Sequence, residues 1–219
     1  YTNRILGNTY FNADITKDLK LTYKIGIDAY GTETKQIFDL GSRGNDAADG
    51  TGQINKSNTN YTQVYSDLIL RYNRRFGDFD FGAMAGYNYW YSETRYNFMR
   101  GANLTVPDVY NLGVASSLYA SNSDAFNRSQ AFFGELNLGY KSFIYLNLTG
   151  RNEWNTAFGK TNNAFFYPNA NLSWIFSEHI ESNDVLSYGK LRLAISKAGI
   201  PPTLYSDRNY YTQPFITDG

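Results

Sequence analysis

Apolar and polar residues alternate with a period of two along much of the chain. A clear example is the segment LKLTYKIGIDAY, residues 19–30. Its apolar face consists of Leu19, Leu21, Tyr23, Ile25, Ile27 and Ala29, whereas the opposite face begins with Lys20, Thr22 and Lys24. Successive side chains of a β-strand point to opposite faces, so this segment predicts a strand with one apolar and one charged side.

The same alternation recurs and predicts an all-β, antiparallel chain of about eight strands. The predicted strands are residues 9–15, 19–30, 61–76, 79–91, 129–140, 143–151, 164–176 and 188–198. Tight turns follow the first, third and fifth strands, at 16–18, 77–78 and 141–142. The links at 31–60, 92–128 and 152–163 are long and polar, and the link at 177–187 has room for one helical turn. Short turns at one rim and long loops at the other are typical of outer-membrane β-barrels.

Aromatic residues on the apolar faces recur near both ends of the predicted strands. Phe81 and Tyr89, Phe132 and Tyr140, and Phe166 and Trp174 are each eight residues apart. Eight residues span about 26 Å along a strand, or about 20 Å along the normal of a tilted barrel, close to the apolar band of such barrels. These six residues are therefore predicted to form two aromatic girdles at the membrane interfaces. The alternative, a soluble β-sandwich, would place large rings in the middle of its strands.

The composition fits this interpretation. The chain contains 20 Tyr and 15 Phe, and no apolar run is long enough for a spanning helix. A barrel is polar on average because only every second residue faces lipid. No N-terminal signal peptide is visible, so the chain is expected to be a piece of a longer polypeptide.

The polar faces are too charged for a packed core and predict a wet or plugged lumen. They carry Lys20, Lys24, Asp67, Arg71, Asp80, Glu135, Asn137, Asn147, Arg151, Asn169, Asn171, Lys190 and Arg192. Eight strands could close on their own with a lumen just filled by side chains, whereas larger barrels hold a plug. The long loops favour an arc of a larger barrel.

Two segments resemble the SusC/RagA family of TonB-dependent outer-membrane transporters. They are TGRNEWNTAFGKTNNAFFYPNANLSWIFSE, residues 149–178, and LSYGKLRLAISKAGIPP, residues 186–202. The stretches that carry the resemblance are Arg151 to Trp154, Tyr167 to Trp174, Ser177-Glu178 and Lys190 to Gly199; the hairpin at 130–150 fits as well. Over residues 1–126 only the architecture agrees.

The resemblance implies that residues 1–219 are a middle part of a 22-stranded, multi-pass barrel in the outer membrane of a Gram-negative bacterium. The plug, the TonB-contacting segment and the closing C-terminal strand would lie elsewhere. The resemblance further implies import of oligosaccharides or peptides, energy from the TonB complex, and a SusD-like surface lipoprotein as partner. Lipid or lipopolysaccharide would surround the barrel. Two alternatives are a SusC-like barrel that serves as a non-transporting scaffold and a self-contained eight-stranded barrel.

Candidate ligand-binding residues lie near the predicted long-loop mouth. They are Trp90, Arg95, Arg151, Asn152, Glu153 and Trp154, with Tyr96 nearby. Aromatic faces stack on sugar rings, and Arg, Asn and Glu hydrogen-bond hydroxyl groups. For each single residue, a place in the aromatic girdle or in a lumenal ion-pair network is the competing interpretation.

Other functional classes find little support in the residues. Lys+Arg and Asp+Glu both number 20, which argues against nucleic-acid binding. There is no Cys and a single His, His179, so neither a catalytic constellation nor a metal centre or cofactor site is predicted. Residues 39–50 are rich in acidic groups but depart from the EF-hand pattern, so Ca²⁺ binding is a weak alternative to a plain loop. Arg71, Arg74 and Arg75 could touch lipid phosphate or lie at a solvated strand end.

One residue conflicts with a regular barrel. Pro168 lies inside a predicted strand and cannot donate a ladder hydrogen bond. A bulge or a missing rung is therefore expected there.

Overall fold

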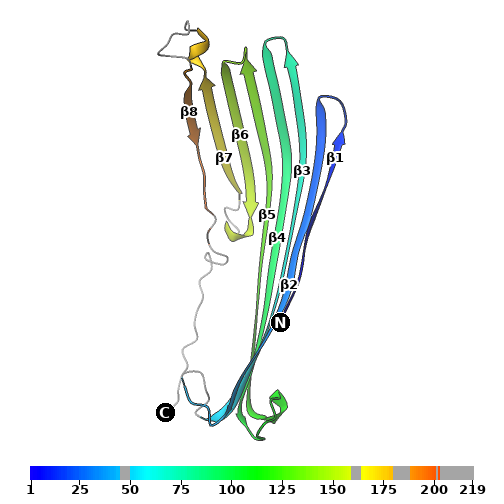
Figure 1. Cartoon of the computed structure of the whole chain (residues 1–219), viewed down its shortest axis with the longest axis vertical. Coiled ribbons are helices and arrows are strands. Elements are labelled where there is room, and N and C mark those ends of the chain that lie inside the picture. Colours follow the sequence, from blue (N-terminus) through cyan, green and yellow to red (C-terminus); the bar gives the residue numbers. More distant parts are fainter. Residues whose placement is uncertain (45–49, 159–163, 180–187, 201, 203–219) are drawn as a thin grey trace. The chain divides into compact units, whose positions relative to one another are not determined.

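The chain forms one antiparallel sheet in the order β1-β2-β3-β4-β5-β6-β7-β8 (Figure 1). The computed structural model describes residues 1–44, 50–158, 164–179, 188–200 and 202. The strands are β1 (Thr2–Asp14), β2 (Leu19–Leu40), β3 (Thr51–Phe76), β4 (Phe79–Leu104), β5 (Ala115–Tyr140), β6 (Ile144–Asn155), β7 (Ala164–Trp174) and β8 (Leu191–Ser196). Three short 3-10 helices are η1 (Leu112–Val114), η2 (Thr156–Phe158) and η3 (Phe176–His179). The all-β prediction is confirmed, and η3 is the helical turn expected after the seventh strand.

The order of the strands excludes two of the alternatives. Among the described residues, β1 and β8 are the two ends of the order and do not neighbour each other. The sheet is thus open, and it is not a self-contained eight-stranded barrel. It is also a single sheet rather than the two packed sheets of a sandwich. No helix in the described part of the chain is long and apolar enough to cross a membrane.

The contacts divide the chain into two compact units. Unit 1 comprises residues 1–9, 25–65 and 90–126, and unit 2 comprises residues 10–24, 66–89 and 127–219. All the tight turns belong to unit 2, and the connections 41–50 and 105–114 belong to unit 1. The links from β6 to β7, residues 156–163, and from β7 to β8, residues 175–190, belong to unit 2. The division into units therefore separates tight turns from longer connections from β1 to β6, but not for the two links that follow β6.

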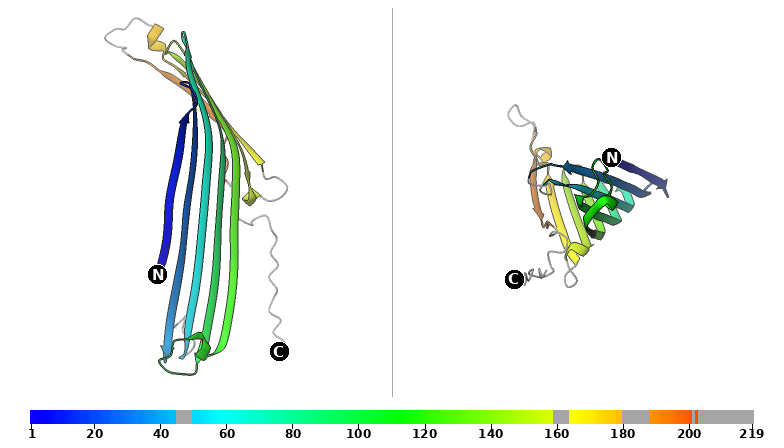
Figure 2. Two further views of the ribbon diagram at one scale, coloured as in Figure 1. Left: turned by 90° about the vertical axis from the view of Figure 1, so that its right-hand side faces the viewer. Right: turned by 90° about the horizontal axis from the view of Figure 1, so that it is seen from below.

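The predicted loops at 31–60 and 92–128 are mostly strand. β3, β4 and β5 each have 26 residues, and β2 has 22 (Figure 2). The prediction was wrong here because it looked for an apolar face. Segments such as INKSNTNY, residues 54–61, are rich in Asn and lack that face, but their backbones still pair with the neighbouring strands. At about 3.3 Å per residue, a strand of this length spans roughly 86 Å, far more than the apolar band of a membrane.

The tight turns have the backbone conformations that their residues suit. Lys141 and Ser142 both have positive φ, 46° and 60°, as in the two-residue turns that match the twist of a hairpin. Gly77 also has positive φ, 59°, which glycine adopts without a steric penalty. These turns fix the register of β3 with β4 and of β5 with β6.

Two chemically distinct faces of unit 2 result from this register. The first row of the apolar face pairs Leu138 with Leu146, Leu146 with Leu172, and Leu172 with Leu193. The next row continues through Leu136, Leu148, Ala170 and Ile195. We call this side the apolar face, and the opposite side, with Asp80, Glu135, Asn147, Arg151 and Asn171, the polar face. Leu148, Leu172 and Leu193 are exposed on the apolar face, which needs an apolar solvent or partner to cover it.

Pro168 is accommodated without the predicted bulge. The pairing of β6 with β7 continues evenly through Gly150 and Pro168. The amide N–H of Lys197 donates to the carbonyl of Pro168 (3.0 Å), so the backbone polar groups of Pro168 face β8. The last β7–β8 pair is Asn169 with Ser196. The backbone hydrogen bond that proline cannot donate would therefore be made at the end of the β7–β8 ladder.

Candidate functional site

A charged cluster on the polar face joins four strands of unit 2. The Arg151 guanidinium donates from Nε to Oε2 of Glu153 (3.0 Å) and from Nη2 to Oδ1 of Asn88 (3.3 Å). The amide of Asn88 in turn donates to Asp67 (2.6 Å). The hydroxyl of Ser129 donates to Oε1 of Glu153 (2.8 Å). We call these five residues the Arg151 cluster.

The Arg151 cluster combines one ion pair with hydrogen bonds from neighbouring strands. The side chains of Arg151 and Glu153 are 36% and 18% exposed, so the pair is only partly desolvated. The cluster's guanidinium, carboxylate, amide and hydroxyl groups lie on the polar face. A hydroxylated or amide-containing ligand could exchange hydrogen bonds with such groups.

The structure separates the four neighbouring residues predicted to bind a ligand. The predicted loop at 152–163 is wrong at its start, because β6 continues to Asn155. Alternation then places Asn152 and Trp154 on the apolar face, away from Arg151 and Glu153. The indole of Trp154 contacts the ring of Phe132 edge-on, with centroids 6.1 Å apart. Residues 159–163 of the predicted loop lie outside the described residues.

Trp90 and Arg95 belong to unit 1, unlike the four residues of β6. Both lie within β4, which was predicted to contain Trp90 but to end at residue 91, so that Arg95 was expected in a loop. Arg95 pairs with Glu93 at 2.7 Å between Nε and Oε1. The hydrogen bond from Arg95 lowers the pKa of Glu93 below its ordinary value. Arg95 thus has an acidic partner on its own strand, and ligand binding by Trp90 and Arg95 stays a prediction.

Asparagine side chains form a ladder across three strands of the polar face. Asn147 donates to Oδ1 of Asn137 (2.7 Å), and Asn171 donates to Oδ1 of Asn147 (3.1 Å). Both Asn137 and Asn147 also donate to Glu135. These amides satisfy one another and donate to the carboxylate, so the wall here is polar and carries the negative charge of Glu135.

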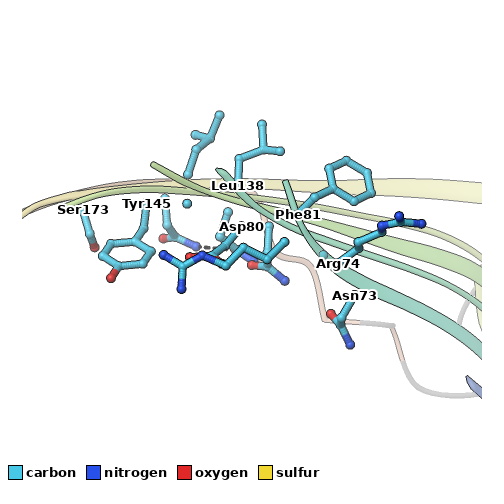
Figure 3. A pocket seen from close by; sticks show the side chains of 14 residues that line it. Asn73, Arg74, Asp80, Phe81, Leu138, Tyr145 and Ser173 are labelled. Atoms are coloured by element: carbon cyan, nitrogen blue, oxygen red, sulfur yellow. Dashed lines mark hydrogen bonds and ion pairs between the residues drawn. The ribbon is translucent and has the colours of Figure 1, made fainter. Parts of the chain in front are cut away.

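A pocket of about 460 Å³ opens beside this ladder, near the tight turns (Figure 3). Its lining includes Arg75, Asp80, Asn137, Tyr145 and Ser173, one from each of five strands. Nε of Arg75 lies 3.5 Å from Oδ1 of Asp80. Sequence reasoning missed this pocket because its residues meet only through pairing of β3, β4, β5, β6 and β7. The arginine pair Arg74-Arg75 near a turn was the available signal.

Unit 1 has an aromatic and charged cluster that was also not predicted. The rings of Tyr30 and Tyr61 stack with centroids 4.9 Å apart. Arg4 binds Asp28 through two hydrogen bonds of 2.8 and 2.7 Å and lies 5.9 Å from the Tyr30 ring centroid. The signal was one aromatic residue on each of two strands, whose pairing the predicted loop at 31–60 concealed.

The predicted girdle residues of β5 and β7 are aligned by the register. Phe132 and Phe166 both lie opposite Asn152, and Tyr140 and Trp174 both lie opposite Ile144. On β4 the rings that contact these rows are those of Tyr87 and Phe79, two residues nearer the turn than the predicted Tyr89 and Phe81. All four β4 residues share one face by alternation. Their role at membrane interfaces stays a prediction.

The weak Ca²⁺ alternative falls partly outside the described residues, which omit 45–49. No group of three or more His, Cys, Asp or Glu residues suited to a metal ion occurs in the part that the structure describes.

Comparison with known proteins supports the resemblance seen in the sequence. Two TonB-dependent receptors of Formosa agariphila are similar to this chain. Receptor P3 is 22% identical over 147 residues, which are 65% of this chain and 15% of that protein. Receptor P26 is 34% identical over 71 residues, which are 32% of this chain and 7% of that protein. No family model matches the chain.

Solved structures of the RagAB peptide importer share the fold. The open-open state aligns with a TM-score of 0.81 at 16% identity, over 89% of this chain and 22% of that one. The closed-closed state aligns with a TM-score of 0.79 at 16% identity, over 88% of this chain and 22% of that one.

These comparisons confirm the predicted fold, antiparallel strands that match part of a larger barrel, and the resemblance to TonB-dependent receptors and to the RagAB importer. This chain spans less than a quarter of the length of each of these relatives. Their names describe receptors and importers, which supports the prediction that the chain is not an enzyme.

Proposed function

We propose that the chain is part of the β-barrel of a TonB-dependent transporter in the outer membrane of a Gram-negative bacterium. The observation that carries this proposal is the two-faced sheet of unit 2. Its apolar face exposes leucines between two aligned aromatic rows, and its polar face carries an asparagine ladder and the Arg151 cluster. Lipid on one side and water on the other satisfy both faces.

The strands beyond the aromatic rows extend on the long-loop side of the membrane. In barrels of this kind the longer loops are extracellular and the short turns periplasmic. The connections 41–50 and 105–114 would therefore lie at the cell surface. A SusD-like lipoprotein would dock there, and TonB would act through parts of the protein outside these residues.

Cargo would pass along the polar face. The asparagine ladder, the Arg151 cluster and the Tyr30–Tyr61 stack offer amides, paired charges and aromatic rings, which suit oligosaccharides or peptides. The comparison with a peptide importer and the sugar-stacking chemistry of tyrosine leave both cargo classes as candidates.

Growth of a deletion strain tests the proposal. We expect the strain to lose growth on a defined oligosaccharide or peptide source, and full-length protein expressed from a plasmid to restore it. Restoration that requires an intact TonB system supports energised import. Equal growth of the mutant and the parent on all sources, together with retention of the lipoprotein by the purified protein, would instead favour a non-transporting scaffold.

A further inference from the structure

Two basic side chains flank the aromatic row at the tight-turn end of the apolar face. The guanidinium of Arg74 lies 5.2 Å from the ring centroid of Phe76, and the ammonium of Lys141 lies 5.5 Å from that of Tyr140. Tyr72, on the same face of β3 as Arg74 and Phe76, contacts the Phe81 ring of the apolar face. Arg74 and Phe76 therefore lie on the side proposed to face lipid.

Each of these cations has an acidic neighbour. Nη1 of Arg74 lies 3.4 Å from Oδ2 of Asp18, and Nζ of Lys141 lies 3.6 Å from Oδ2 of Asp78. Both distances exceed those of a close charge-assisted hydrogen bond. The side chains of Arg74, Lys141 and Asp78 are 47%, 51% and 61% exposed, whereas that of Asp18 is 19% exposed. The three exposed charges can therefore interact with groups from solvent or lipid, and Asp18 offers a smaller accessible area.

Backbone hydrogen bonds tie the turns that carry these charges to their neighbours. The amide N–H of Lys141 donates to the carbonyl of Asp78 (2.8 Å), which joins the two neighbouring turns. The amide N–H of Asn73 donates to the carbonyl of Asp18 (2.9 Å), which joins the β1–β2 turn to β3. The ring centroids of Phe79 and Tyr140, the residues next to Asp78 and Lys141 in the sequence, lie 4.7 Å apart. We call Arg74, Lys141, Asp18 and Asp78, with these rings, the turn-end collar.

We propose that the turn-end collar binds the zwitterionic headgroup of phosphatidylethanolamine. Arg74 and Lys141 would contact the phosphate, and Asp18 and Asp78 would accept hydrogen bonds from the ammonium group. Two cations and two anions leave the collar without net charge, which favours a zwitterionic over an anionic headgroup. The trimethylated ammonium of phosphatidylcholine has no N–H to donate to the aspartates, so it fits less well. The rings of Phe76 and Tyr140 would cover the start of the acyl chains.

This inference rests on the membrane embedding in the proposed function, but not on transport. The test uses the full-length protein, purified in detergent and stripped of lipid. Phosphatidylethanolamine, phosphatidylcholine and phosphatidylglycerol with the same acyl chains are added separately. Native mass spectrometry counts bound lipids, and thermal unfolding measures the change in Tm.

Wild-type protein should retain phosphatidylethanolamine in preference to the other two lipids and gain the largest increase in Tm from it. The double variant Arg74→Gln/Lys141→Gln should lose this preference while its unfolding without lipid stays cooperative. Lys20→Gln is the matched control, because Lys20 pairs with Asp14 at 3.3 Å on the opposite face, and it should keep the preference.

Stronger retention of phosphatidylglycerol or phosphatidylcholine by the wild type would overturn the proposal. So would an unchanged preference in the double variant. Failure of the protein to insert into vesicles at all would instead contradict the proposed membrane location, so the two failures are distinguishable.

Discussion

Tyr140 on β5 and Trp174 on β7 lie opposite the same residue, Ile144, of the strand between them. Eight residues along, Phe132 and Phe166 likewise share Asn152. The equal spacing seen in the sequence is therefore a spatial alignment of two aromatic rows. Between the rows, the apolar face of β5, β6 and β7 consists of leucine, alanine and glycine, with Pro168 opposite Gly150.

A charge placed between the rows should destabilise the barrel in a lipid-dependent way. Leu148 lies on the apolar face midway between the rows and is 38% exposed. We expect Leu148→Arg to lower the free energy of unfolding by about 2–4 kcal/mol, the cost of arginine on the lipid face near the bilayer midplane. Urea unfolding of the full-length protein in lipid vesicles measures the change.

Thr149→Arg is the matched control, because Thr149 is adjacent in sequence but lies on the polar face, where Asn169 donates to it. Its effect should be small. Equal losses in both variants would contradict the assignment of lipid and water to the two faces.

Gly86 leaves room for an aromatic ring on the polar face. A Cβ added at Gly86 would lie closer to the ring of Phe133 than real Cβ atoms approach. Gly86→Ala should therefore displace Phe133 and cost about 1–3 kcal/mol, as overpacking typically does. Thermal unfolding of the purified full-length protein measures this loss.

The double variant Gly86→Ala/Phe133→Leu should recover part of that stability, since the smaller side chain makes room. Gly134→Ala is the control, because the nearest atom to its added Cβ is a carbonyl oxygen at 3.4 Å. A loss at Gly134 as large as that at Gly86 would argue against a specific contact with Phe133.

Arg151 organises the charged cluster through Glu153 and Asn88. Arg151→Gln would leave the partly buried Glu153 with hydrogen bonds from Ser129 and Asn155 but without its cationic partner. We expect the free energy of unfolding to fall by about 1 kcal/mol. This is near the lower end of the cost of leaving a buried polar group without its partner, because Glu153 keeps some solvent contact. The double variant Arg151→Gln/Glu153→Gln should lose less than the sum of the single variants. Strict additivity in thermal unfolding would show that the pair does not interact energetically.

Most of the fold that could be predicted followed from the alternation of apolar and polar residues along the strands. The turns at 77–78 and 141–142 were readable because glycine, aspartate, lysine and serine interrupt two alternating segments. The outer halves of β2 to β5 were not readable, because strands without a buried face have no amphipathic period to reveal them. Their pairing depends on backbone hydrogen bonds to neighbours that are distant in sequence.

The candidate site shows the same limit. The pairing of Arg151 with Glu153 was anticipated as a lumenal network. Asn152 and Trp154 were grouped with them only because β6 was expected to end at residue 151. A strand continued to Asn155 would have placed these two residues on the opposite face by alternation alone. Asn88 and Asp67 could not be assigned to the cluster, since their contact depends on the register of β3 with β4.

Arg95 should control the ionisation of Glu93. The hydrogen bond from Arg95 lowers the pKa of Glu93, with a further contribution from Tyr91. A carboxyl group with a lowered pKa contributes stability above its unfolded-state pKa, and that contribution is lost as pH falls through the folded-state pKa. Arg95→Gln should raise the pKa of Glu93 toward its ordinary value. NMR of ¹³C-carboxyl-labelled glutamate, titrated in the acidic range with Glu93→Gln to assign the signal, measures this shift. An unchanged titration would show that the pair is not formed in solution.

Pro168 should be replaceable at little cost, despite its position within a strand. Its backbone groups face β8 where the β7–β8 ladder ends, so Pro168→Ala would supply an N–H toward the carbonyl of Lys197. The added hydrogen bond, about 0.5–1.5 kcal/mol, is offset by the greater freedom of the unfolded chain, about 0.4–1 kcal/mol, so the net change should be small. Asn169→Pro provides the contrast, because the backbone groups of Asn169 face β6 within a continuous ladder. That variant should be clearly destabilised, since it removes an internal rung. Similar unfolding midpoints for the two variants would contradict this orientation of β7.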